Sequence, residues 1–191
     1  MLHPITLTNT ANAISLHEFS VGKAYQSIEY PGIRQCFAIV GMRQSYMIGV
    51  HVSPGFHADG IDDAFEKLRG LGGNWVADWY VVGPFGHHFA AGPNTAWKSA
   101  TDIRNSFKQA FGDSGANHNI LDVTILRDQK HLGDLGGGPV NLSTDYLDIR
   151  ADYPAQGNAV NISYRSSHRD GQNRRQDSAW ERLNPWLFNR F

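Results

Sequence analysis

Two apolar runs separated by a polar centre dominate the pattern between residues 33 and 52. The runs at 33–40 and 46–52 are rich in β-branched and aromatic side chains, whereas the centre reads Met42-Arg43-Gln44-Ser45. Such a pattern predicts two antiparallel strands joined by a turn.

Helical periodicity follows the predicted hairpin. Apolar residues at 61, 64, 65 and 68 share one side of a helix that ends near Gly70, and charged residues occupy the other side. A second helix is expected at 102–111, with Thr101 as its N-terminal cap. Further strands are predicted at 75–82, 120–126, 146–150 and 160–164. We therefore expect an α+β fold, a mixed or antiparallel, sandwich-like sheet with two main helices against it.

The two ends of the chain give less regular patterns. Residues 1–30 carry weak local signals, and the chain becomes polar and arginine-rich beyond residue 165 before it ends on several aromatic residues. We predict one main domain at 1–165, followed at 166–191 by a polar connection and an aromatic docking segment.

Composition narrows the classes of function. The chain has 191 residues, 41% of them hydrophobic, and a net charge of −1, so nothing in it attracts nucleic acid or an anionic membrane as a whole. One cysteine excludes an intramolecular disulfide and a cysteine-rich zinc site. No apolar run is long enough to span a membrane, and no signal peptide is evident at the N-terminus.

That single cysteine, Cys36, and the histidine at position 51 fall on the two predicted strands. With a four-residue loop at 42–45, Cys36 lies directly opposite His51, and Ala38 lies opposite Gly49. Opposed residues have Cβ atoms roughly 4.5–5.5 Å apart, which lets an imidazole lower the pKa of a thiol. The alternative is structural, because free cysteine is often a small buried hydrophobe.

Other candidate sites have weaker patterns. His87-His88 could assist a thiol or bind a metal, but neighbouring side chains of an extended chain point in opposite directions, so a solvated loop is the simpler interpretation. We expect no metal site and no cofactor. Trp75 and Trp79 are expected in the core, and the arginines near residue 170 are expected on a solvated face.

The order of these elements resembles the CheD chemoreceptor glutamine deamidases and, more distantly, the catalytic domains of the cytotoxic necrotizing factors. Cys36 and the segment Gly49-Val50-His51-Val52-Ser53-Pro54 match the family's cysteine strand and its Gly-x-His strand. The elements that follow match in order over residues 25–150, through Pro93-Asn94 and Gly136-Gly137. Arg34-Gln35 replaces the small residues that the family has before its cysteine.

This resemblance implies a protein-glutamine deamidase, with transglutamination as a variant. It implies Cys36 as nucleophile and His51 as its acid and base, with Ser27, Gln35 and Gly49 as weaker supporting candidates. The expected partner is a protein with a reactive glutamine. The expected location is the cytoplasm or, for a secreted effector, a host cytosol. The alternative function is a non-enzymatic interaction module in which Cys36 is structural.

Overall fold

The computed structural model describes residues 4–56, 58–90, 95–112, 118–124, 146–155, 159–169, 172 and 174–184. The loops with Pro93-Asn94 and Gly136-Gly137, and the aromatic residues Trp186 and Phe188, lie outside the described residues. In the part described, no helix is long and apolar enough to cross a membrane.

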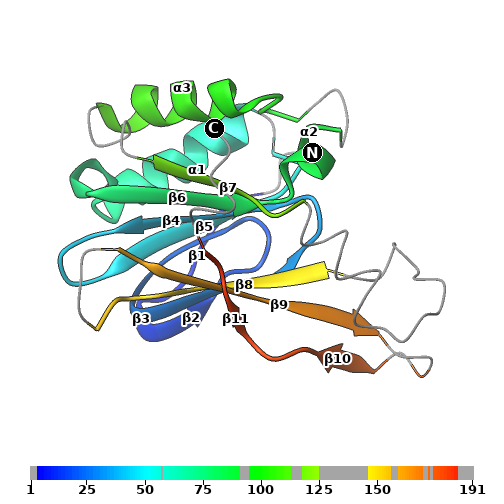
Figure 1. The fold of residues 1–191 in the computed structure, drawn as a ribbon. Helices are drawn as coiled ribbons and strands as arrows, with labels where there is room; N and C mark the ends of the chain where they lie inside the picture. Colours follow the sequence, from blue (N-terminus) through cyan, green and yellow to red (C-terminus); the bar gives the residue numbers. More distant parts are fainter. Residues whose placement is uncertain are drawn as a thin grey trace.

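The chain forms one mixed sheet with helices on one side of it (Figure 1). The order along the sheet is β10-β9-β8-β3-β5-β4-β6-β7, with β1 and β2 also paired to β3 and β11 also paired to β9. The helical elements are α1 (Ala58–Gly70), η1 (Gly73–Trp75), α2 (Phe85–Phe89) and α3 (Ala100–Phe111). The strands are β1 (Thr6–Leu7), β2 (Ala11–Ser15), β3 (Ser20–Ile33), β4 (Phe37–Met42), β5 (Met47–Val52), β6 (Asp78–Gly83), β7 (His118–Asp122), β8 (Tyr146–Asp152), β9 (Asn161–Arg169), β10 (Arg175–Asp177) and β11 (Glu181–Arg182).

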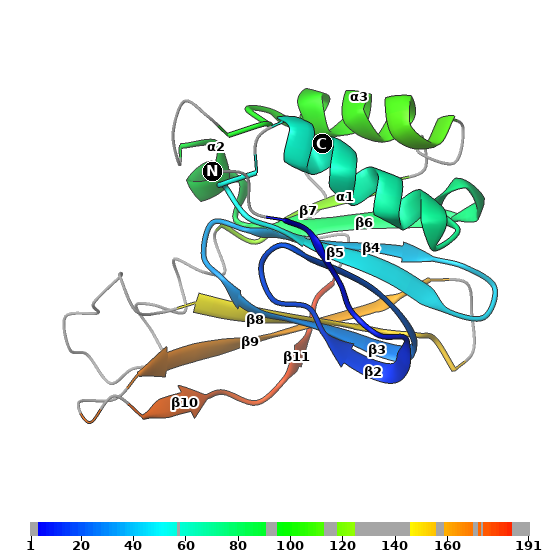
Figure 2. The ribbon, with the colours of Figure 1, turned by 180° about the vertical axis from the view of Figure 1, so that it is seen from behind.

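The sheet curls about the long strand β3. The first part of β3 pairs with β5 and its second part pairs with β8, while β1 and β2 run parallel to it. Figures 1 and 2 show β4, β5 and β6 next to the helices, with β8 and β9 on the side away from them. The predicted α+β class with a sheet covered by helices is confirmed.

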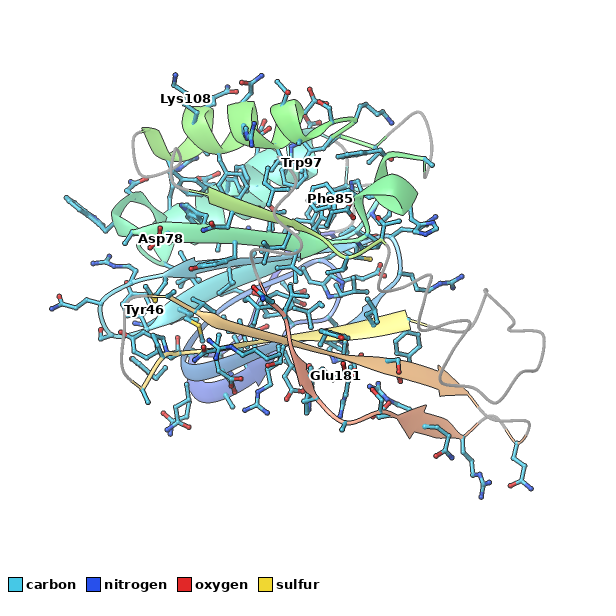
Figure 3. The ribbon with its side chains drawn as sticks, viewed as in Figure 1. Tyr46, Asp78, Phe85, Trp97, Lys108 and Glu181 are labelled. Carbon is cyan, nitrogen blue, oxygen red and sulfur yellow. The ribbon has the colours of Figure 1, made fainter. Side chains whose placement is uncertain are left out.

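Each face of the β4–β5–β6 layer covers its own hydrophobic core. One core fills the space between this layer and the helices, and Trp97 and Phe85 lie in it (Figure 3). The other core lies within the curl, against β3 and β8, and it contains Cys36 and Tyr30. Because side chains alternate along a strand, β4 and β5 supply both cores, and every residue in them is buried.

The chain beyond residue 165 continues the sheet. Strand β9 crosses the boundary that the sequence predicted, and both β10 and β11 pair with β9. Leu183 is buried in the inner core. These described residues are therefore part of the main fold, and the interpretation of them as a polar connection was wrong.

A buried carboxylate links three segments of this half of the sheet. Asp148 on β8 is 2% exposed and accepts hydrogen bonds from the Gly32 backbone at 3.0 Å and from Arg165 at 2.9 Å, and it also pairs with Arg175. Two of the C-terminal arginines are thus ion-paired rather than solvated. Gly32 has φ of +77° at an irregularity near the end of β3, so Asp148 holds the strand in place shortly before Cys36.

The predicted helices are present, with different starts. The side chain of Ser99, not Thr101, caps α3 by accepting a hydrogen bond from the Asp102 backbone at 3.2 Å. The strand predicted from residue 75 begins only at Asp78, because η1 occupies 73–75. Consequently Trp79 is buried as expected, whereas Trp75 is 74% exposed.

Gly49 has a packing role at the centre of the curl. The Tyr30 hydroxyl crosses over Gly49 and donates a hydrogen bond of 2.6 Å to the Ile39 carbonyl. A Cβ at Gly49 would overlap that hydroxyl and lie 2.9 Å from the Ile39 oxygen. Glycine is therefore required at this position by the approach of Tyr30.

We predict that Gly49→Ala lowers the free energy of unfolding by roughly 1–3 kcal/mol, because it overpacks a filled site and displaces a buried hydroxyl. Urea denaturation followed by tryptophan fluorescence measures the change. Gly70→Ala is the control, since a Cβ there meets nothing within 4 Å. Equal stability of the two variants would contradict this role of Gly49.

Candidate active site

Strands β4 and β5 form the predicted hairpin, in a different register. Met42 pairs with Met47, so the four-residue loop is 43–46 and not 42–45. His51 consequently lies opposite Ala38, and Cys36 lies just before β4, two positions away from that pair. The predicted direct opposition of Cys36 and His51 was wrong.

Contacts of the loop explain the shift of register. Met42 is apolar and only 7% exposed, so it belongs to the strand and not to the turn. Tyr46 donates its hydroxyl hydrogen bond to the Leu71 carbonyl at 3.1 Å, and the Arg43 guanidinium contacts the Gly72 carbonyl at 3.4 Å. These contacts with the end of α1 place both residues in the loop.

The displacement of two residues keeps Cys36 and His51 on the same face. Cys36 and Ala38 both belong to the inner core, and the His51 ring packs edge-on against Tyr30 of the same core, with centroids 6.2 Å apart. Residues in this relation are diagonal neighbours, roughly 7–8 Å apart and within reach of long side chains. The structure therefore places the Cys36 and His51 side chains on the same face of the sheet, two positions out of direct opposition.

His51 is buried with one ring nitrogen bonded and the other unpartnered. Its Nδ1 lies 2.8 Å from the Leu16 carbonyl oxygen, and its Nε2 has no hydrogen-bond partner in the described structure. Because a carbonyl only accepts, Nδ1 carries the proton and Nε2 keeps its lone pair. Burial lowers the pKa of His51, although the Leu16 carbonyl and the Glu18 charge act in the opposite direction. At rest the imidazole is neutral.

Cys36 is a protonated thiol at rest. It is 3% exposed, and its Sγ donates a hydrogen bond of 3.4 Å to the Glu18 carboxylate. Burial, followed by the charge of Glu18, raises the pKa of the thiol well above its usual range. Backbone hydrogen bonds from Gln35 and Arg34 lower that pKa without outweighing the increase. The expectation that His51 holds a thiolate in the resting site was wrong.

A pocket of about 330 Å³ opens beside the thiol. It is lined by Glu18, Arg34, Gln35, Cys36, Ser53 and Pro54. Predicted candidates Cys36 and Gln35 thus meet at one pocket, whereas His51, Ser27 and Gly49 do not line it. Ser27 lies on β3 opposite Asp152, so the structure gives no support to its predicted assisting role.

Glu18 was missed by the sequence analysis. It lies in the turn between β2 and β3, where it precedes a backbone outlier, Phe19 with φ of +63°. The Phe19 amide donates to the His51 carbonyl at 3.2 Å, and its ring stacks on Phe56 at 4.8 Å. A charged residue in a weakly patterned segment gives no sequence signal that it will contact a cysteine 18 positions away.

His88 supports the segment before Cys36 from the other side. It lies in α2 and is 1% exposed, and its ring stacks on Phe37 with centroids 3.9 Å apart. Its Nδ1 donates a hydrogen bond of 2.5 Å to the Gln35 carbonyl. The predicted solvated loop at His87-His88 was wrong for His88, which fixes the peptide that precedes the thiol.

Metal ligation has no geometric basis among the residues that the structure describes. Within those ranges, no group of three or more histidine, cysteine, aspartate or glutamate residues is arranged to hold an ion.

Comparison with known proteins adds no family assignment. Neither the scan against protein-family models nor the search of curated proteins gives a match for this chain.

Burial of His88 predicts a loss of stability in acid. Its pKa is lowered from 6.5 to about 4, chiefly by burial, so the folded state binds fewer protons than the unfolded chain between those values. Stability therefore falls as the pH drops through this window, by about 3 kcal/mol for this residue.

Urea denaturation between pH 7 and pH 4 tests the assignment. We expect His88→Asn, which retains a side-chain N–H donor, to show a shallower decrease in unfolding free energy than the wild type. His87→Asn removes a histidine from the same helix and should retain the wild-type decrease. Identical pH profiles for the wild type and His88→Asn would contradict the prediction.

Proposed function

We propose that the protein hydrolyses the side-chain carboxamide of a glutamine residue in a target protein, with Cys36 as the nucleophile. The observation that carries the proposal is the state of His51: its Nδ1–H is held by the Leu16 carbonyl, and its buried Nε2 has no partner. An unsatisfied buried nitrogen costs free energy, roughly 1–3 kcal/mol, and such groups call for an explanation such as catalysis. A neutral imidazole with a free lone pair, on the same face of the sheet as the thiol, fits a general base.

The protonation states favour a proton transfer that accompanies attack. Because the pKa of Cys36 is raised and that of His51 is lowered, a stable thiolate–imidazolium pair is not the resting state. In the proposed mechanism Nε2 accepts the thiol proton as Sγ forms a bond with the carboxamide carbon. The Leu16 carbonyl orients the ring and stabilises its charged form.

At the carboxamide carbon, the new bond to sulfur then replaces the bond to nitrogen. The C–N bond breaks as the proton on His51 passes to the leaving nitrogen, which gives ammonia and a thioester. A water molecule, deprotonated by Nε2, attacks the thioester, and Sγ recovers its proton as glutamate leaves. An amine in place of water would give transglutamination by the same route.

Backbone amides next to the thiol supply a site for developing negative charge. The hydrogen bonds from Gln35 and Arg34 that lower the pKa of Cys36 show that these groups stabilise charge at the sulfur. Amides in such an arrangement can also stabilise an oxyanion. His88 supports this segment because it holds the Gln35 carbonyl, in the peptide that joins Gln35 to Cys36.

The choice of glutamine rests on the resemblance to the CheD deamidases, in which a cysteine strand precedes a Gly-x-His strand. The pocket of about 330 Å³ is large enough for a single side chain, which suits a residue presented by a protein partner. A thiol enzyme of this kind works in a reducing cytosol, whether that of its own cell or that of a host.

One observation favours a second candidate, a non-enzymatic interaction module. Cys36 is 3% exposed in the inner core and its pKa is raised, as expected for a structural cysteine. Under this second hypothesis, substitution of Cys36 leaves the biological interaction intact and no amide is hydrolysed.

Ammonia release from benzyloxycarbonyl-Gln-Gly and from casein distinguishes these functions. We expect Cys36→Ser and His51→Gln each to reduce the rate by roughly 10³-fold or more, because the nucleophile and its base act as a unit. Mass spectrometry of the casein checks the conversion of glutamine to glutamate.

The matched control is His87→Asn, which removes a histidine of α2 that has no part in the proposed mechanism. Circular dichroism establishes that each variant is folded. Activity retained in folded Cys36→Ser, or no ammonia from the wild type with either substrate, would favour the interaction module.

A further inference from the structure

The negative charge of Glu18 stands at the point where a substrate would meet Cys36. Its Oε1 lies 3.4 Å from Sγ, and its side chain lines the same pocket. The residue is exposed, and it lines the pocket together with Cys36. Any group that approaches the sulfur through this pocket therefore passes close to the carboxylate.

The turn that carries Glu18 is fixed on both sides. Leu16, two residues before it, holds Nδ1 of His51, and Phe19, directly after it, donates its amide hydrogen bond to the His51 carbonyl. The ring of Phe19 also stacks on Phe56, which follows the pocket residues Ser53 and Pro54. Glu18 thus has a defined position relative to both proposed catalytic residues.

A carboxylate distinguishes a carboxamide from a carboxylate by simple chemistry. It can only accept hydrogen bonds, the –NH₂ group of a carboxamide donates two, and an ionised carboxylic acid donates none. Two like charges also repel each other, and the Coulombic effect of Glu18 on the pKa of Cys36 shows that its charge is felt at the sulfur.

We propose that Glu18 selects an uncharged carboxamide over a carboxylate at the Cys36 thiol. It accepts a hydrogen bond from the –NH₂ group of the incoming glutamine side chain and repels the glutamate that hydrolysis produces. This inference rests on the proposed function. It explains how the same pocket would prefer the glutamine substrate to the glutamate product. Arg34, the cation lining the pocket, acts in the opposite direction by attracting a carboxylate.

Alkylation of the thiol provides a direct test, because Cys36 is the single cysteine of the chain. Iodoacetamide and iodoacetate react at the same kind of carbon, but the first carries a carboxamide and the second a carboxylate. The ratio of their second-order rate constants, measured by intact-protein mass spectrometry, cancels any change in the pKa of the thiol. Dividing by the same ratio for N-acetylcysteine removes the intrinsic difference between the reagents.

We expect the normalised ratio of the wild type to favour iodoacetamide by roughly tenfold, since a site built to bind a donor rejects a ligand without one. Glu18→Gln should bring the ratio close to one. Glu18→Asp, which keeps the charge, should retain most of the wild-type preference for iodoacetamide. Arg34→Gln should raise the ratio. Glu66→Gln is the matched control for loss of one negative charge, because Glu66 lies on α1 and does not line the pocket, and its ratio should equal that of the wild type.

Three results would overturn the inference: an unchanged ratio in Glu18→Gln, an equal change in Glu66→Gln, or a wild-type thiol that reacts with neither reagent. The first leaves the deamidase proposal standing, because that proposal is tested by ammonia release. Conversely, a ratio that depends on Glu18 in a protein that releases no ammonia would support selection of carboxamides at the pocket and contradict hydrolysis.

Discussion

Strand β3 is the element on which the rest of the structure depends. Its 14 residues pair with β1, β2, β5 and β8, so its backbone joins the half of the sheet under the helices to the half formed by β8 and β9. Because the paired strands follow its bend, the sheet closes over an inner core. The bend is stabilised by Tyr30, whose hydroxyl reaches across Gly49 to the Ile39 carbonyl. Cys36 and His51 lie in the core that this curl encloses.

Burial in that core sets the chemistry of the site. A low-dielectric environment disfavours charge on both groups, so Cys36 is held as a thiol and His51 as a neutral imidazole. The neighbouring carboxylate of Glu18 reinforces the neutral thiol. In the proposed mechanism the proton leaves sulfur only as a new bond forms, so the resting thiol would have a low reactivity. That property would limit side reactions of the single thiol in a cell.

Local periodicity identified the helices and several strands, since apolar spacing depends only on neighbouring residues. It failed where contacts between distant segments decide the outcome. The hairpin register depended on Met42 entering the strand and on Tyr46 bonding to the end of α1. The early strands β1 and β2 gave weak signals because they are short. They also run parallel to β3, and no turn motif in the sequence predicts such a pairing. Trp75 was misplaced because η1 ends before β6 begins.

The sequence by itself determined which residues carry the candidate chemistry: one cysteine at the start of the hairpin and one histidine on its second strand. They share a face because a shift of two residues preserves the alternation of side chains. The tertiary structure decided the charge states and the neighbours. It brought the Leu16 carbonyl to His51 and the Glu18 carboxylate to Cys36, and it buried His88 against Phe37. These contacts join segments far apart in the chain, and burial is a property of the assembled core, so a local pattern of residues does not contain them.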